Sequence, residues 1–145
     1  FANHHLSKNH KEISAEAFAY LYHRFDGITW YVQYVLNMLY TSITDKPLLE
    51  EDDVKFAIDV ILAQHRFAYQ ALIYQLTAKQ KQVLTAIALE GKPSSLMSQE
   101  FLQKYHLGAS TVQGAVKTLL DRDFITQDEG VYQLCDKFLE LSLRG

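Results

Sequence analysis

The feature that most constrains the fold of this chain is a pair of short helical patterns in its second half, joined by a tight turn that contains a glycine. Ser98 is placed to cap a short helix, whose inward face is Phe101, Leu102 and Tyr105. The turn covers residues 106–109, and Ser110 is predicted to cap the next helix, with Gln113 three residues later. The apolar positions of that helix repeat at helical spacing, at Val112, Ala115, Val116 and Leu119. Two helices joined in this way predict a helix-turn-helix.

A third helix precedes this pair and a hairpin follows it. Thr77 and Gln80 form a capping-box pattern, and the helix that they begin is predicted to end at Gly91. Residues 124–127 and 131–134 read as two strands, with Asp128, Glu129 and Gly130 as a three-residue loop in which the glycine is left-handed. Three helices and then a hairpin predict a winged helix-turn-helix domain over residues 76–145.

Residues 1–75 predict a separate subdomain of four helices. Ser14 is placed to cap the first, and Gly27 is predicted to end it in a left-handed conformation. Val32, Val35, Leu36 and Leu39 mark the second, and the acidic run 50–53 begins the third. A fourth pattern covers residues 67–76, and because no Gly or Pro precedes it, it is either separate from the third or continuous with it. The whole chain is therefore expected to be mainly α, with one small β-hairpin.

Four stretches of the chain resemble the C-terminal region of P-loop ATPases of the archaeal-type and STAND branch of the AAA+ superfamily. Residues 76–91 resemble a helix of that family, and residues 110–125 resemble its next long helix and first strand. Residues 136–139 resemble its closing D-P-x-F segment, with Lys137 in the place of the proline. Residues 26–29 lie where the lid of that family carries a G-G-x-P turn between two helices, with Thr29 in the place of the proline.

The resemblance implies that the first half is a lid-like subdomain and that the chain is a non-catalytic regulatory region of an ATP-binding protein. In such lids the turn approaches the nucleotide, which would place Asp26, Gly27 and Thr29 near it; a plain corner between two helices is the alternative. The sequence holds no G-x-x-x-x-G-K followed by Ser or Thr, so we expect no ATPase activity and no cofactor in this chain. ATP and Mg²⁺ would belong to the parent protein. Because the chain begins at Phe1, we expect it to be a fragment with a P-loop encoded upstream.

The surface of the winged helix favours protein contact over DNA binding. Residues 77–145 hold eight Lys or Arg and eight Asp or Glu, and residues 1–76 carry a net charge of −3. The second helix of the helix-turn-helix is the recognition helix, and its outward face is predicted to hold Thr111, Gln113, Gly114, Lys117 and Thr118. The hairpin is the wing, and its loop adds Asp128, Glu129 and Gly130. This face has little charge to neutralise phosphates, so the expected partner is the ATPase core of the same parent chain or another protein. The alternative is a DNA-binding transcriptional regulator in which Lys104, Lys117 and Arg122 converge.

The histidines and the single cysteine do not form the pattern of an active site or a metal site. An enzyme would need His23, His65 or His106 as a general base, and none has a nucleophile at suitable spacing. His4, His5 and His10 lack the spacing of a metal site, so no metal is predicted. A single cysteine excludes an internal disulfide and fits the cytoplasm, and no apolar run is long enough to span a membrane.

Overall fold

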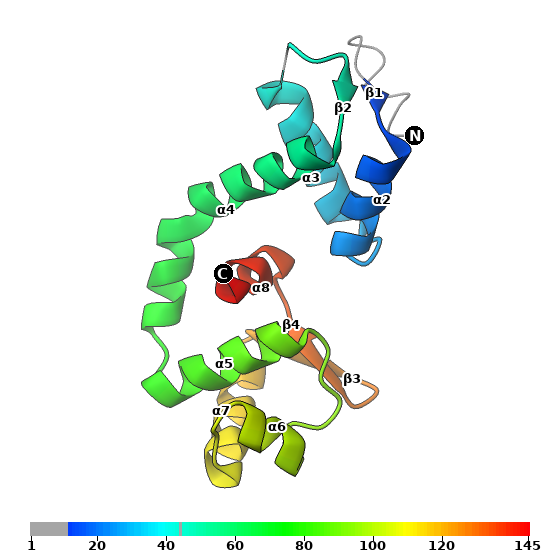
Figure 1. The fold of residues 1–145 in the computed structure, drawn as a ribbon. Helices are drawn as coiled ribbons and strands as arrows, with labels where there is room; N and C mark the ends of the chain where they lie inside the picture. The colour runs from blue at the N-terminus through cyan, green and yellow to red at the C-terminus, as the bar shows by residue number, and fades with distance from the viewer. Residues whose placement is uncertain (1–11, 44) are drawn as a thin grey trace. The chain divides into compact units, whose positions relative to one another are not determined.

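The structure, a computed structural model, describes residues 12–43 and 45–145, which form two compact units (Figure 1). The first unit extends to His65 and the second covers Arg66–Gly145. The described residues are mainly helical, and an antiparallel two-stranded hairpin lies near the C-terminus. The predicted fold class is therefore confirmed.

The described part of the first unit is built from α2 (Ala15–Arg24), α3 (Thr29–Ser42) and the first part of α4 (Glu51–Tyr74). Its buried side chains come from all three helices and include Leu21, Phe25, Val35, Leu36, Leu39, Val54 and Ile61. The predicted cap of α2 is confirmed, since the Ser14 hydroxyl accepts a hydrogen bond from the N–H of Ala17 at 3.0 Å. Two short strands, β1 (Glu12–Ile13) and β2 (Leu48–Leu49), pair in parallel. They were not predicted, because a two-residue strand has no periodicity.

The third and fourth helical patterns of the first half form one continuous helix, α4, which is the second of the two alternatives that the sequence left open. The absence of Gly and Pro between the two patterns lets the backbone hydrogen bonds continue without a break. The boundary between the two units falls within α4, after His65, whereas the predicted boundary followed residue 75.

The second unit contains α5 (Ala78–Glu90), α6 (Gln99–Lys104), α7 (Ala109–Asp121), β3 (Ile125–Asp128), β4 (Val131–Leu134) and α8 (Lys137–Arg144). Its core draws side chains from α5, α7, the hairpin and α8, among them Leu84, Ile87, Leu119, Ile125, Leu134 and Leu139. The strands pair from Ile125 opposite Leu134 to Asp128 opposite Val131. The N–H of Tyr132 also donates to the carbonyl of Pro93 at 2.9 Å, so the connection between α5 and α6 runs along β4.

The end of α4 is part of this second unit. Tyr69 and Ile73 pack against its core, and Leu76 is buried in it. The Tyr69 hydroxyl donates to Oδ2 of Asp136 at 2.8 Å, which ties α4 to the start of α8. The core of the second unit therefore needs a helical segment upstream of α5.

Most of the predicted caps of the second unit are present. Thr77 and Gln80 form the capping box, and the Ser98 hydroxyl accepts from the N–H of Phe101 at 3.2 Å. The prediction that Ser110 caps α7 is wrong, because Gly108 is the N-cap residue and provides no side-chain hydrogen bond. The Gly108 carbonyl already accepts from the N–H of Val112 at 3.0 Å, which leaves Ser110 inside the first turn.

The hairpin is tighter than predicted. Asp128 pairs with Val131 at the end of the ladder, so the loop consists of Glu129 and Gly130 alone, with φ values of 50° and 79°. Two positive φ values are typical of a type I′ turn, which matches the twist of the strands. Phe124 lies outside the strand in which it was predicted.

In the part of the chain that the structure describes, three helices end at a left-handed residue that is not glycine. Asp26, His106 and Asp123 follow α2, α6 and α7 with φ values of 53°, 54° and 60°. After each one, the next N–H donates back across the last turn; the N–H of Phe124, for example, donates to the Leu119 carbonyl at 2.9 Å. This is the hydrogen-bond pattern of a Schellman motif. Asp26 thus takes the first left-handed position that was predicted for Gly27, which is left-handed as well, with a φ of 68°.

Candidate functional site

The exposed face of α7 is the first part of the candidate site. Val112, Ala115 and Leu119 face the core, so the residues between them point away from it. Gln113, Gly114 and Lys117 are exposed, whereas Thr111 and Thr118 are half-buried. Nothing lies within 4 Å of the position that a Cβ on Gly114 would take. This face is therefore polar, nearly neutral and shallow at its centre.

The wing completes the site by closing a groove against α7. The groove has a volume of about 300 Å³ and is lined by Gln113 and Val116 from α7, Gln127, Gly130 and Tyr132 from the hairpin, and residues 94–97. The structure thus brings together two predicted site residues, Gln113 and Gly130. Residues 94–97 were not identified from the sequence, because their place beside β4 depends on contacts between distant residues, such as the Pro93–Tyr132 backbone hydrogen bond. We call this cavity the α7–wing groove.

Comparison with protein families assigns this arrangement of helices and hairpin. A family model described as a probable winged helix domain matches residues 67–145. The chain belongs to this winged helix family. The match begins inside α4, close to Arg66, where the second compact unit begins. No curated protein and no solved structure matches the chain.

Two cations of the winged helix domain that were considered for DNA contact are held by other side chains. Lys104 Nζ donates to Glu90 Oε1 at 2.6 Å, and the Tyr105 hydroxyl donates to the same oxygen at 2.5 Å. These hydrogen bonds lower the pKa of Glu90. Arg122 donates to the side-chain oxygen of Gln75 at 2.6 Å. Of the three cations considered for DNA contact, Lys117 is the one for which the described residues show no such side-chain hydrogen bond.

The tip of the wing is acidic. Asp128 and Glu129 are both exposed, and the described residues place no cation in an ion pair with either of them. The α7–wing groove itself offers amides, hydroxyls and apolar side chains, which can donate and accept hydrogen bonds from a peptide. Its lining residues include neither a histidine nor a cysteine.

In the first unit, the turn between α2 and α3 holds the predicted residues Asp26, Gly27 and Thr29. A Cβ on Gly27 would lie 2.6 Å from Cζ of Tyr22, so the absence of a side chain lets that ring close over the turn. Thr29 is the first residue of α3, a position that suits proline. The packing of Tyr22 accounts for Gly27 in a plain corner, and contact of this turn with a nucleotide stays a prediction.

Over residues 12–43 and 45–145, no group of three or more His, Cys, Asp or Glu side chains could hold a metal ion. The acidic run begins α4 as predicted, and Oδ2 of Asp53 accepts from the Glu50 N–H at 2.8 Å and from Lys46 at 2.9 Å. His4, His5 and His10 lie outside the described residues. Nor does this part of the chain contain a helix long and apolar enough to cross a membrane.

The three histidines considered as general bases each occupy a structural position within their own unit. His23 packs edge-on against the ring of Tyr22, and Nδ1 of His65 lies 2.9 Å from the Ile61 carbonyl oxygen. His106 occupies the turn between α6 and α7. None of them lines that groove.

Proposed function

We propose that this chain is a non-catalytic regulatory region of a P-loop ATP-binding protein of the AAA+ or STAND type, in which the winged helix domain binds protein. Its partner is the ATPase core of the same parent chain or another protein. The resemblance of residues 26–29, 76–91, 110–125 and 136–139 to that superfamily supports the ATPase context. The face made by α7 and the wing supports the choice of protein over DNA.

The observation that supports protein binding over DNA binding is the charge of the face made by α7 and the wing. Lys117 is its one cation among the exposed residues of α7, and Asp121, Asp128 and Glu129 are exposed close to it in sequence or on the wing. Affinity for DNA comes largely from cations that displace counterions from phosphates, and acidic groups oppose this. A helix that reads base edges brings Arg, Lys, Asn or Gln into the groove, and here only Gln113 and Lys117 qualify. A peptide, by contrast, can use the neutral hydrogen-bonding groups of the α7–wing groove.

A titration with duplex DNA tests this choice. Fluorescence anisotropy with a labelled mixed-sequence duplex should give a Kd no tighter than ~10⁻⁴–10⁻⁶ M near physiological salt, the range of non-specific association. Lys117→Ala should leave this value unchanged, as should the matched control Lys79→Ala. Sub-micromolar binding that weakens steeply with salt, and that Lys117→Ala abolishes while Lys79→Ala does not, would instead support a DNA-binding regulator.

The ATPase context has its own test. The reading frame that encodes this chain should also encode a Walker-type loop upstream of Phe1, in a strand–loop–helix setting. Phosphate release from ATP by the present chain alone should equal that of a buffer blank, because positioning and charge neutralisation of the phosphates need that loop. A complete reading frame without a P-loop would contradict the ATPase context and would leave the winged helix assignment intact.

A further inference from the structure

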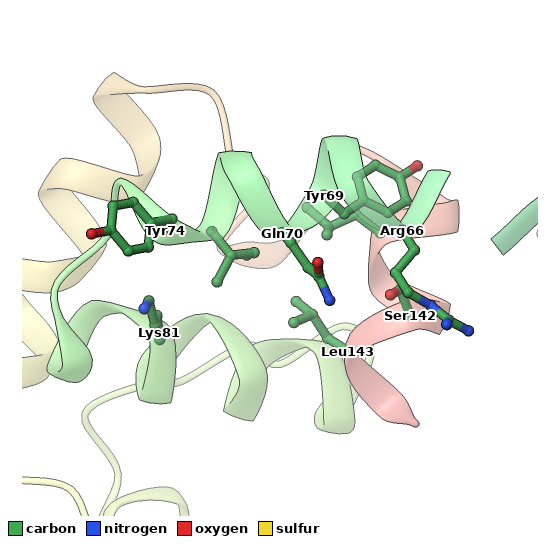
Figure 2. A pocket seen from close by; sticks show the side chains of 9 residues that line it. Arg66, Tyr69, Gln70, Tyr74, Lys81, Ser142 and Leu143 are labelled. Atoms are coloured by element: carbon green, nitrogen blue, oxygen red, sulfur yellow. The ribbon is translucent and has the colours of Figure 1, made fainter. Parts of the chain in front are cut away.

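The winged helix domain contains a second groove, formed by the last turns of α4 and by residues of α5 and α8 (Figure 2). Its volume is about 400 Å³. Ile73, Leu139 and Leu143 provide the apolar part of its lining, and Gln70 points between the helices. None of its lining residues belongs to α7 or to the wing, so it is separate from the α7–wing groove. We call it the α4–α5–α8 groove.

Positive charge lies at both ends of this groove. Figure 2 shows Lys81 beside Tyr74 at one end and Arg66 beside Ser142 at the other. Lys81 Nζ lies 5.9 Å from the centroid of the Tyr74 ring, and Tyr74 is 83% exposed. Within the described part of the chain, neither Lys81 nor Arg66 forms an ion pair.

No acidic side chain lines the groove to neutralise these two cations. One lining residue, Tyr69, is hydrogen-bonded to an acidic side chain outside the lining, that of Asp136. Its Oδ2 accepts from Tyr69 at 2.8 Å, and its Oδ1 accepts from the N–H groups of Phe138 and Leu139 at the start of α8. Both oxygens of the Asp136 carboxylate therefore accept hydrogen bonds from within the domain. The groove combines an apolar lining with an unneutralised charge at each end.

We propose that the α4–α5–α8 groove docks an acidic segment of a partner protein, in which large apolar side chains lie between two groups of carboxylates. The apolar part of the lining would accept the apolar side chains, and Arg66 and Lys81 would each face a carboxylate. The exposed ring of Tyr74 adds a rigid amphipathic contact at the Lys81 end. A segment with carboxylates on only one side of its apolar residues would leave Arg66 or Lys81 without an opposite charge, so the matching segment carries carboxylates on both sides. This inference rests neither on the ATPase context nor on the function of the α7–wing groove.

Anisotropy titrations of the full chain test the proposal with two labelled peptides. The first carries a short Leu- and Phe-rich centre between two clusters of glutamates, and the second replaces every glutamate by lysine. The acidic peptide should bind, and the lysine peptide should bind at least about tenfold more weakly, because opposite charges attract and like charges repel at the rim. The double variant R66E/K81E should weaken the acidic peptide about tenfold or more and should strengthen the lysine peptide.

A matched control separates the groove from the general field of the protein. K79E/K117E makes the same change in charge at two exposed lysines outside the groove, and it should retain affinity for the acidic peptide within about twofold. Gln70→Trp fills the groove without a change in charge and should abolish binding of the acidic peptide. Circular dichroism melts establish that each variant is folded before its affinity is compared.

Several outcomes would overturn the proposal. These are no detectable binding of the acidic peptide, equal losses in R66E/K81E and K79E/K117E, or unchanged affinity in Gln70→Trp. Binding of phosphatidylserine vesicles that R66E/K81E abolishes, without peptide binding, would assign the groove to an anionic lipid surface instead. Each outcome is independent of whether duplex DNA binds at α7.

Discussion

The hydrogen bond between Tyr69 and Asp136 offers the sharpest test of how α4 belongs to the winged helix domain. The two residues lie 67 positions apart in the chain, and their side chains meet at 2.8 Å in a partly buried position. Asp136 performs two tasks with different oxygens, since Oδ2 accepts from Tyr69 while Oδ1 caps α8 at the N–H groups of Phe138 and Leu139. The variants Tyr69→Phe, Asp136→Ala and the double variant separate these tasks.

The expected magnitudes follow from the two tasks. A hydrogen bond to a charged acceptor contributes about 1.5–3 kcal/mol, and partial exposure places this one near the lower end, so Tyr69→Phe should cost about 1.5 kcal/mol. Loss of an N-cap costs about 1 kcal/mol, so Asp136→Ala should cost about 2.5 kcal/mol in total. The double variant should also cost about 2.5 kcal/mol, because the shared hydrogen bond is lost only once. The coupling free energy is then about 1.5 kcal/mol.

Urea unfolding followed by far-ultraviolet circular dichroism measures these free energies. Trp30 is the single tryptophan of the chain and lies in α3 of the first unit, so its fluorescence gives an internal control that should shift less. Asp136→Asn retains a capping oxygen and should cost less than Asp136→Ala. If the costs of the two single variants simply add in the double variant, to within about 0.5 kcal/mol, the Tyr69–Asp136 contact does not stabilise the domain and this reasoning fails.

Three further predictions concern the same domain. A fragment of residues 66–145 should unfold cooperatively in calorimetry. A fragment of residues 76–145 lacks Tyr69 and Ile73, so its transition temperature should be lower by at least about 10 °C. Equal transition temperatures would place the domain boundary after residue 75. Gly114→Ala should raise the free energy of unfolding by up to about 1 kcal/mol, since the added methyl group meets no atom within 4 Å and alanine favours the helix, and a loss of stability in urea would contradict this. Hydrogen bonds from Lys104 and Tyr105 lower the pKa of Glu90. The ionised carboxylate therefore stabilises the fold at pH values above the pKa that Glu90 has in the unfolded chain. This contribution is lost as the pH falls through the lowered pKa of the folded state. Glu90→Gln should therefore be less stable than the wild type at about pH 7, with a difference that shrinks to nearly nothing by about pH 2–3; a difference independent of pH would rule out this role of the carboxylate.

Local sequence signals were sufficient to predict the order of elements in the winged helix. The capping box of Thr77 and Gln80, the cap at Ser98 and the left-handed Gly130 each depend on residues within a few positions of one another. The apolar stripe of α7 likewise follows from helical periodicity alone. Such signals act through neighbouring backbone groups, so they retain their meaning without knowledge of the tertiary fold.

The same local reasoning failed where a residue adopts a conformation that its type disfavours. Asp26, His106 and Asp123 end helices in the left-handed region, where sequence rules expect glycine. Each turn is closed by a hydrogen bond across the last helical turn; the N–H of Phe124, for example, donates to the Leu119 carbonyl, and Phe124 is buried in the core. The residues around Asp123 do not predict its left-handed conformation.

The tertiary structure alone decided which unit the end of α4 joins and which charges stay available to a partner. The helical spacing of Tyr69 and Ile73 is the same whichever core they face, and only their contacts with Asp136 and the winged helix core distinguish the two. Lys104 is held by Glu90 and Arg122 by Gln75, while Arg66 and Lys81 flank the α4–α5–α8 groove. Periodicity states which side of a helix is apolar, but the side chains opposite that helix come from distant parts of the chain. Their identity, and with it the charge of each groove, depends on the tertiary fold.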